Sequence, residues 1–319
     1  MRNRIISLTL GCLLLLFSAC QRLTPVPAPT VTGTTMPSPT IPSTPAINPS
    51  PTPTLSGATA TFVPTLSMFT PTPHMQGPYA VVEVQEGDRL NVRAEAGVQA
   101  RVVAALPPTA TDVYLTGASQ QVDGARWVEI QRGSDAKVRG WVNAFFLTPW
   151  IPSEDFCAAT ERQAVLGALE QAIRQRDGRQ LADLVSPVHG MTVWLWRSGK
   201  PIRFDAGHAR WVFTSTYSHN WGMHPASGLE TSGSFQEAVL PALEDAFLHS
   251  HEVRCNERTV PGLLDSSVIP VSVQNYNVFK VLKPGSAGVE LDWRIWMVAV
   301  EVLDGKPYLT ALIHFQWEP

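Results

Sequence analysis

Residues 293–317, WRIWMVAVEVLDGKPYLTALIHFQW, decide the architecture of the C-terminal part of this chain. Two runs rich in β-branched, aromatic and other apolar residues flank Asp304-Gly305, a dipeptide typical of a two-residue type I′ turn. The stretch therefore predicts an antiparallel hairpin with strands at 289–302 and 307–317. If every residue pairs across the turn without a break, Val302 faces Pro307 and Ile295 faces His314.

The two faces of this predicted hairpin differ in chemistry. One face carries only core-type side chains, because alternate residues from Trp296 to Val302 are apolar. The other face combines Trp293 and Ile295 with His314, so it is either half-solvated or the wall of a pocket. Trp293, Ile295 and His314 are therefore candidate ligand-binding residues. His314 is the best single candidate for a functional histidine, and its alternative role is structural.

Helices are expected before this hairpin. Apolar residues at four-residue spacing predict an amphipathic helix over 160–176, and a second, short helix should stop before Pro187. Ser234 and Glu237 form a capping-box pattern that opens a third helix, which Pro241 kinks or restarts. A further strand is expected at 211–214. Residues 155–319 thus predict an α+β domain of cone-like architecture, a curved antiparallel sheet wrapped by helices with the ligand site on its concave face.

Residues 79–149 have a different character, with short alternating runs separated by turn residues. Many short strands in so few residues predict a small all-β barrel. Three motifs, at 90–94, 123–130 and 140–147, resemble the bacterial SH3 (SH3b) domain in order and spacing. The resemblance implies an SH3-like barrel that binds cell-wall peptides or docks against a neighbouring domain. The aromatic candidates for its ligand surface are Tyr114, Trp127 and Trp141, each of which could instead belong to the core.

The C-terminal region also has a resemblance of its own. Residues 155–319 look similar to an uncharacterised domain of bacterial envelope proteins, on the strength of residues 186–190, 292–293 and 304–317. This resemblance implies a class of protein and brings no activity with it.

The N-terminal residues predict export. A basic start, an apolar run from Ile5 to Phe17 and the small residues Ser18 and Ala19 describe a signal peptide over 1–20. The sequence Leu16 to Cys20 resembles the bacterial lipobox, which implies cleavage before Cys20 and lipidation of its thiol. We therefore expect a lipoprotein that is extracytoplasmic and membrane-anchored, at the cell surface or the periplasmic face, with the lipid on Cys20 as its contact with the membrane.

Residues 21–78 form a Pro/Thr-rich linker. No Lys, Arg, Asp or Glu occurs between Arg22 and Glu83. Few large apolar side chains are present and proline removes backbone donors, so this linker should remain disordered and extended. It is either a stalk that lifts the folded part away from the membrane or a permissive spacer.

The chemistry-bearing residues favour binding over catalysis. Cys157 and Cys255 are the two cysteines of the folded part, and an exported pair predicts a disulfide. The alternative is that Cys157 is a nucleophile at a helix N-terminus. We find no motif for a metal, a cofactor or a hydrolase nucleophile, so none of these is expected. A net charge of −3 gives nucleic acid no electrostatic support as a partner.

These features together favour a multidomain, non-catalytic lipoprotein. It would bind the cell wall (peptidoglycan) or another envelope component, with a small-ligand pocket in the C-terminal domain. The two alternatives are a cell-wall-processing hydrolase that uses Cys157 or His314, and a structural or assembly subunit of the envelope.

Overall fold

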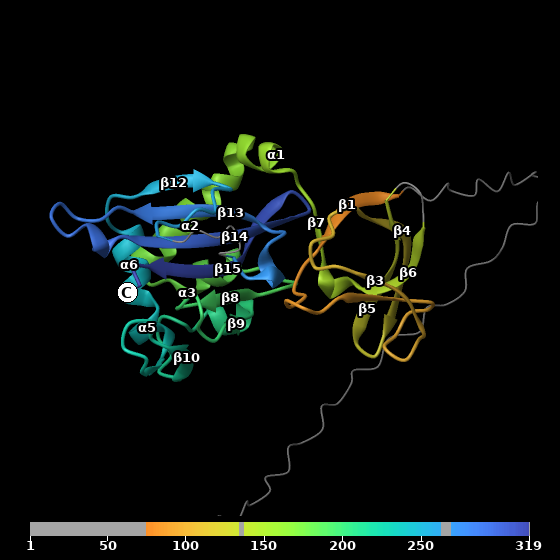
Figure 1. Ribbon diagram of the computed structural model, residues 1–319, viewed down its shortest axis with the longest axis horizontal. Coiled ribbons are helices and arrows are strands. Elements are labelled where there is room, and N and C mark those ends of the chain that lie inside the picture. Colours follow the sequence, from red (N-terminus) through yellow and green to blue (C-terminus); the bar gives the residue numbers. More distant parts are fainter. Residues whose placement is uncertain (1–74, 134–136, 263–268, 319) are drawn as a thin grey trace, which may run out of the picture. The chain divides into compact units, whose positions relative to one another are not determined.

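The structure, a computed structural model, describes residues 75–133, 137–262 and 269–318. This part of the chain is mostly β, with one curled antiparallel sheet, a second large sheet and several short helices. The helices lie around the second sheet (Figure 1), and their apolar residues pack with one of its faces. The signal peptide, Cys20 and nearly all of the linker lie outside the described residues.

The first large sheet has seven strands in the order β3-β2-β6-β5-β4-β1-β7, and every pair in it is antiparallel. Leu90 and Val92 alternate with outward-facing residues along β2, so they contribute to a small apolar core on the concave side of the curled sheet. A single turn of 3-10 helix, η1 (Ala144–Phe146), precedes the last strand. The strands are β1 (Gln76–Val81), β2 (Leu90–Arg93), β3 (Val102–Leu106), β4 (Val113–Val122), β5 (Ala125–Arg132), β6 (Val138–Asn143) and β7 (Leu147–Pro149).

The second large sheet has six strands in the order β12-β13-β14-β15-β8-β9. Its pairs are antiparallel except for β15 and β8, which run parallel. The expected wholly antiparallel sheet is therefore corrected to a mixed one. The strands are β8 (Met191–Trp194), β9 (Ile202–Phe204), β12 (Glu252–Cys255), β13 (Asn277–Lys283), β14 (Arg294–Leu303) and β15 (Lys306–Gln316).

The hairpin of β14 and β15 confirms the predicted turn and corrects the predicted register. Asp304 and Gly305 both have positive φ, as a type I′ turn requires, and Val302 faces Pro307. A bulge then inserts Thr310, so that Ala299 pairs with Ala311 and Trp296 pairs with His314. Because side chains alternate along a strand, this single extra residue moves His314 to the opposite face from Ile295. The predicted mixed face does not form.

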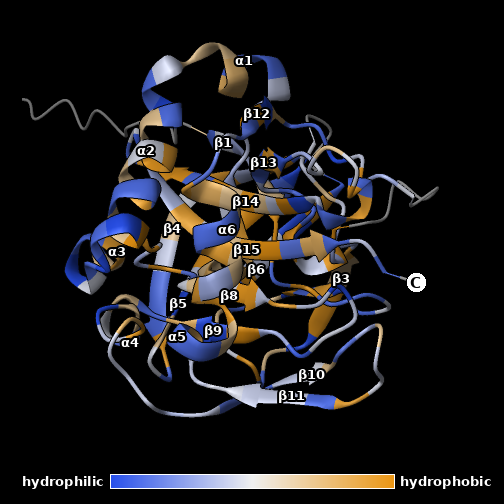
Figure 2. Cartoon of the chain, turned by 90° about the vertical axis from the view of Figure 1, so that its left-hand side faces the viewer, coloured by the Kyte–Doolittle hydropathy of each residue, from blue (hydrophilic) through white to orange (hydrophobic). Residues whose placement is uncertain are grey.

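Both faces of the six-stranded sheet are buried. Trp296, Val298 and Leu312 pack against the helices on one face. Ile295 and Ile313 pack on the other face against the segment that contains Tyr276. Figure 2 shows orange, hydrophobic ribbon concentrated in the central strands. The helices are α1 (Ser153–Ala158), α2 (Thr160–Gln175), α3 (Gly178–Leu184), α4 (Ala206–Ala209), α5 (Phe235–Ala238) and α6 (Leu240–Phe247), with 3-10 turns η2 (Val271–Val273) and η3 (Glu290–Asp292).

The helix boundaries follow from local chemistry. The α2 helix ends at Arg176, which adopts the left-handed conformation, and the Asp177 carboxylate then accepts hydrogen bonds from the first backbone N–H groups of α3. Ser234 and Glu237 form the predicted capping box of α5, and Pro241 lies in the first turn of α6, so it restarts a helix.

One predicted strand is wrong. Residues 211–214 form a turn after α4, where the backbone N–H groups of Thr214 and Ser215 donate to the carbonyl of Trp211. Apolar Val212 and Phe213 are buried in the helix-side core through this turn. A small separate hairpin follows it, β10 (His219–Met223) with β11 (Glu230–Gly233).

Candidate functional site

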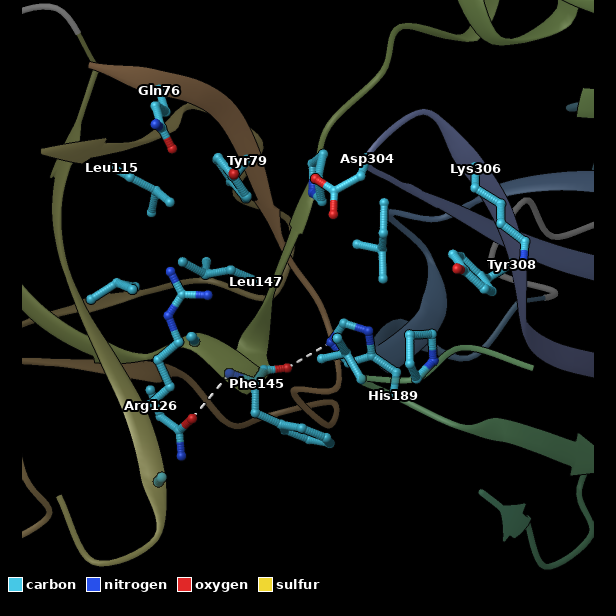
Figure 3. Close-up of a pocket in the computed structure, with 18 of the residues that line it drawn as sticks. Gln76, Tyr79, Leu115, Arg126, Phe145, Leu147, His189, Asp304, Lys306 and Tyr308 are labelled. Carbon is cyan, nitrogen blue, oxygen red and sulfur yellow. Dashed lines mark hydrogen bonds between the residues drawn. The ribbon is translucent and has the colours of Figure 1, made fainter. Parts of the chain in front are cut away.

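A cleft of about 920 Å³ lies between the two large sheets. Its first wall comes from β1, β5 and the segment that ends in β7, and its second wall comes from the β14–β15 turn and the 187–189 loop. Figure 3 shows Tyr79 and Arg126 on one side of this space and Asp304, Lys306 and Tyr308 on the other. The cleft thus offers a concave surface with polar groups on both walls, the usual form of a ligand site.

Two opposite charges influence Tyr79, Arg126 from its own side of the cleft and Asp304 from the other side. Partial burial raises the pKa of the Tyr79 phenol, the Arg126 guanidinium lowers it, and the Asp304 carboxylate raises it. Both charged groups therefore act on the same hydroxyl. No ion-pair partner of Arg126 is found in the described part of the chain. The ammonium of Lys306 instead lies 4.6 Å from the ring centroid of Tyr308, a cation–π contact.

A buried polar network forms the floor of the cleft. The Glu301 carboxylate has no exposed side-chain area and accepts hydrogen bonds from the hydroxyls of Thr148, at 2.7 Å, and of Ser186. Ser186 Oγ also accepts the backbone N–H groups of Val188 and His189, at 3.1 and 2.9 Å, so its own proton is directed to Glu301. A buried carboxylate is tolerated because several donors satisfy it.

His189 completes this network through both nitrogens of its ring. Its Nε2 lies 2.8 Å from the carbonyl oxygen of Phe145, which can only accept, so Nε2 carries a proton. Its Nδ1 lies 2.9 Å from each carboxylate oxygen of Glu301, and a second proton must lie there because two bare acceptors would repel. Both ring nitrogens of His189 are therefore hydrogen-bonded, one to Glu301 and one to the carbonyl of Phe145.

Ser186, His189 and Glu301 do not have the geometry of a catalytic triad. The ring of His189 bonds to Glu301 and to Phe145, and the Ser186 hydroxyl donates to Glu301 rather than to the imidazole. The His189 side chain is also fully buried. The three residues therefore join the two sheets and hold the floor of the cleft in one shape.

A second acidic group extends the junction. Glu83 contacts the guanidinium of Arg203, and it accepts a hydrogen bond of 3.4 Å from the hydroxyl of Tyr276. Burial raises the pKa of Glu83, and the nearby Arg203 and His189 partly oppose this rise. Burial, together with Glu301 and Glu83, raises the pKa of Tyr276 well above its ordinary value, so its hydroxyl remains a donor. Asn275 adds hydrogen bonds of 2.7 Å to the carbonyls of Val81 and Pro108.

The structure separates the pocket residues predicted on the hairpin. Ile295 is wholly buried in the core opposite the helices. His314 is buried on the helix side, where its ring stacks on Trp296 at 4.8 Å and its Nδ1 lies 3.0 Å from the carbonyl oxygen of Leu195. Trp293 borders a small hollow of about 190 Å³ with Trp317. These three residues line no common cavity among those found in the described residues.

The aromatic residues predicted on the seven-stranded sheet are also dispersed. Trp127 is buried and borders a cavity of about 240 Å³ beside Arg93. Tyr114 and Trp141 are half-buried, and neither lines the large cleft. The sequence reasoning missed Arg126, His189 and Glu301. Glu301 had a readable signal, because it is the one acidic residue between Arg294 and Leu303 in an otherwise apolar strand.

The two cysteines of the described chain lie at disulfide-bonding distance, with a Cα–Cα separation of 5.8 Å. Cys157 in α1 is joined to Cys255 at the end of β12, so no free thiol is available at Cys157 for the nucleophile alternative. Across the described ranges, no three His, Cys, Asp or Glu side chains gather as a metal site would require. None of the helices there is both long and apolar enough to cross a membrane.

Comparison with known proteins places the chain in no family. No family, no curated protein and no solved structure shows significant similarity to it. The functional proposal therefore depends on the residues and geometry described above.

Proposed function

We propose that this protein is an extracytoplasmic lipoprotein, held at the membrane by a lipid on Cys20, that binds a component of the cell wall or envelope without transforming it. In this proposal the seven-stranded sheet is an SH3-like barrel, the six-stranded sheet with its helices is a second, cone-like α+β domain, and the linker connects them to the membrane. The signal-like N-terminus and the disulfide support the exported location.

The large cleft is the observation that carries the binding role. It is concave, it presents Arg126 and Asp304 to a common space, and its floor is fixed by the fully buried Glu301–His189 pair. A rigid floor with charged walls lowers the entropy cost of binding and gives orientation through polar contacts. The ligand of such a site carries charged or strongly polar groups.

The binding role is tested with purified full-length protein in detergent micelles and washed cell-wall material. We expect the protein to sediment with the wall, and Arg126→Gln to weaken this binding about tenfold, since a charge-assisted hydrogen bond contributes roughly 1.5–3 kcal/mol. Arg101→Gln is the matched control, because Arg101 is also exposed and lies outside the cleft. A protein that stays in the supernatant, or equal binding by both variants, would count against the cleft.

The anchoring role has its own test. Labelled fatty acid should be incorporated into the expressed chain, and Cys20→Ala should abolish both the label and the partition with membranes. A Cys20→Ala variant that remains membrane-bound would contradict the lipid anchor and would leave the cleft to be judged by the wall-binding assay.

A further inference from the structure

A second hollow lies in the helical part of the molecule, away from the large cleft. It encloses about 410 Å³ where α2 ends, α3 begins and the turn after α4 passes. Three arginines and a tryptophan line it, and we call it the arginine groove: Arg176, Arg179, Arg210 and Trp211. It shares no residue with the lining of the large cleft.

Two of the three guanidinium groups are available to a ligand. Arg176 is bound by the Glu244 carboxylate, with Nη2 2.9 Å from Oε1. Arg179 and Arg210 are exposed and have no ion-pair partner in the part of the chain that the structure describes. The Asp177 carboxylate in the same groove is occupied, because its Oδ1 accepts the backbone N–H groups of Arg179 and Gln180 at 2.9 and 3.1 Å. Those hydrogen bonds leave the formal charge of Asp177 in place, so the three arginines against the carboxylates of Asp177 and Glu244 give the groove a formal charge of +1.

The backbone holds these arginines in a fixed relation. A Cβ atom at Gly178 would lie 2.0 Å from the carbonyl oxygen of Arg210, so the start of α3 rests directly on the turn that carries Arg210. Only glycine permits this approach. The backbones that carry Arg179 and Arg210 are consequently in contact, and both side chains line the same groove.

Trp211 adds an apolar surface beside the charge. Its side chain is 62% exposed, whereas the adjacent Val212 and Phe213 are buried. Its own turn is fixed, because the Trp211 carbonyl accepts the N–H groups of Thr214 and Ser215 at 3.0 and 2.7 Å. A large exposed indole next to two unpaired guanidinium groups suits a ligand that has both an anionic group and a flat apolar face.

We propose that the arginine groove binds an acidic sugar, a hexose that carries a phosphate or a carboxylate. The planar forks of Arg179 and Arg210 bind the anion, since guanidinium groups match both phosphate and carboxylate in bidentate geometry. The C–H face of the pyranose ring packs on the indole of Trp211. The arginine groove is separate from the large cleft, so a negative result at one site does not contradict binding at the other.

Calorimetric titration of the full-length protein tests this site with glucose 6-phosphate and glucuronate as the two probes, and with glucose and inorganic phosphate as controls. We expect saturable binding of at least one acidic sugar with a Kd below roughly 1 mM, and none of glucose in the same range. Binding of only one probe identifies the phosphate or the carboxylate as the anion. Binding of neither overturns the proposal.

Variants assign the binding to the groove. Arg179→Gln with Arg210→Gln should abolish binding of the acidic sugar, and Arg101→Gln should leave it unchanged. Trp211→Ala should weaken binding of the acidic sugar about fivefold or more, as expected for a lost aromatic contact, without changing the titration with inorganic phosphate. Tyr217→Ala is the aromatic control, because Tyr217 is 70% exposed and lies outside the groove.

Unchanged sugar binding in the double arginine variant, verified as folded by circular dichroism, would refute the proposal. If that variant does not fold, Arg179→Lys and Arg210→Lys replace it, since lysine keeps the charge and removes the bidentate fork. These variants should then bind the sugar at least several-fold more weakly than the parent protein, and equal affinity would refute the role of the forks.

Discussion

Replacement of Glu301 by glutamine tests whether the buried network joins the two large sheets. The change keeps the shape of the side chain and removes its charge, so His189 loses its carboxylate partner in a site with no exposed area. The hydroxyl of Ser186 must still donate to position 301, because Ser186 Oγ already accepts two backbone N–H groups. The amide oxygen therefore takes the Oε1 position beside Ser186 and His189, which places the NH₂ group beside the Thr148 hydroxyl and the other side of the His189 Nδ1 contact.

The expected loss in the free energy of unfolding follows from this count. A buried charged pair broken on one side costs about 3–5 kcal/mol, and the hydrogen bonds that the amide keeps recover part of that cost. We expect a loss of about 3 kcal/mol for Glu301→Gln, measured by urea denaturation of the folded chain with fluorescence and circular dichroism as probes. Glu252→Gln is the control, since Glu252 lies in the same sheet with a half-exposed side chain paired to Arg254, and should change stability by at most about 1 kcal/mol.

A double-mutant cycle isolates the pair itself. With His189→Gln as the second change, the coupling energy between positions 189 and 301 should be about 1–3 kcal/mol. A coupling near zero, or a Glu301→Gln loss no larger than that of Glu252→Gln, would refute the argument that this pair fastens the floor of the cleft.

Three further predictions concern the rest of the fold. Burial lowers the pKa of His314 to about 4, below its ordinary value of 6.5. The unfolded chain therefore binds a proton at His314 more strongly than the folded chain, and the free energy of unfolding should fall by about 3 kcal/mol between pH 6.5 and pH 4. His314→Phe should flatten this pH dependence in urea titrations at several pH values. The loop closed by Cys157 and Cys255 spans 98 residues, so Cys157→Ala with Cys255→Ala should lower the free energy of unfolding by about 4.7 kcal/mol in the chain-entropy account. A loss below about 1 kcal/mol would contradict it. Gly178→Ala should destabilise the fold by about 1–3 kcal/mol through its clash with the Arg210 carbonyl, whereas Gly167→Ala, with open space around it in α2, should raise the thermal midpoint.

Sequence patterns predicted those elements that depend on residues within a few positions of one another. The Asp304-Gly305 turn, the α2 helix and the capping box of Ser234 all depend on residues within a few positions of one another, and all three are present. The bulge at Thr310 was not predicted by these patterns, because no glycine marks it and a threonine is equally common in a regular strand. It nevertheless decided which face His314 occupies.

The candidate site was harder to predict because its members are distant in sequence. Glu301 is joined to Thr148 and Ser186 across separations of 153 and 115 residues, and to His189 across 112. Only tertiary packing brings such groups together, and the spacing of residues in the sequence does not indicate these contacts. An isolated carboxylate in an apolar strand signals that a partner must exist, since an unpaired buried charge is too costly to retain. It does not say which residue the partner is.

The strand β12 stands at one edge of the six-stranded sheet, where its unpaired backbone groups could recruit a strand from another molecule. Glu252 and Arg254 place charges along it, and Cys255 ties its end to the first helix. The disulfide thus affects association between molecules as well as the stability of a single molecule. The short length of β12, its charges and its disulfide together oppose the addition of a strand from a neighbouring molecule.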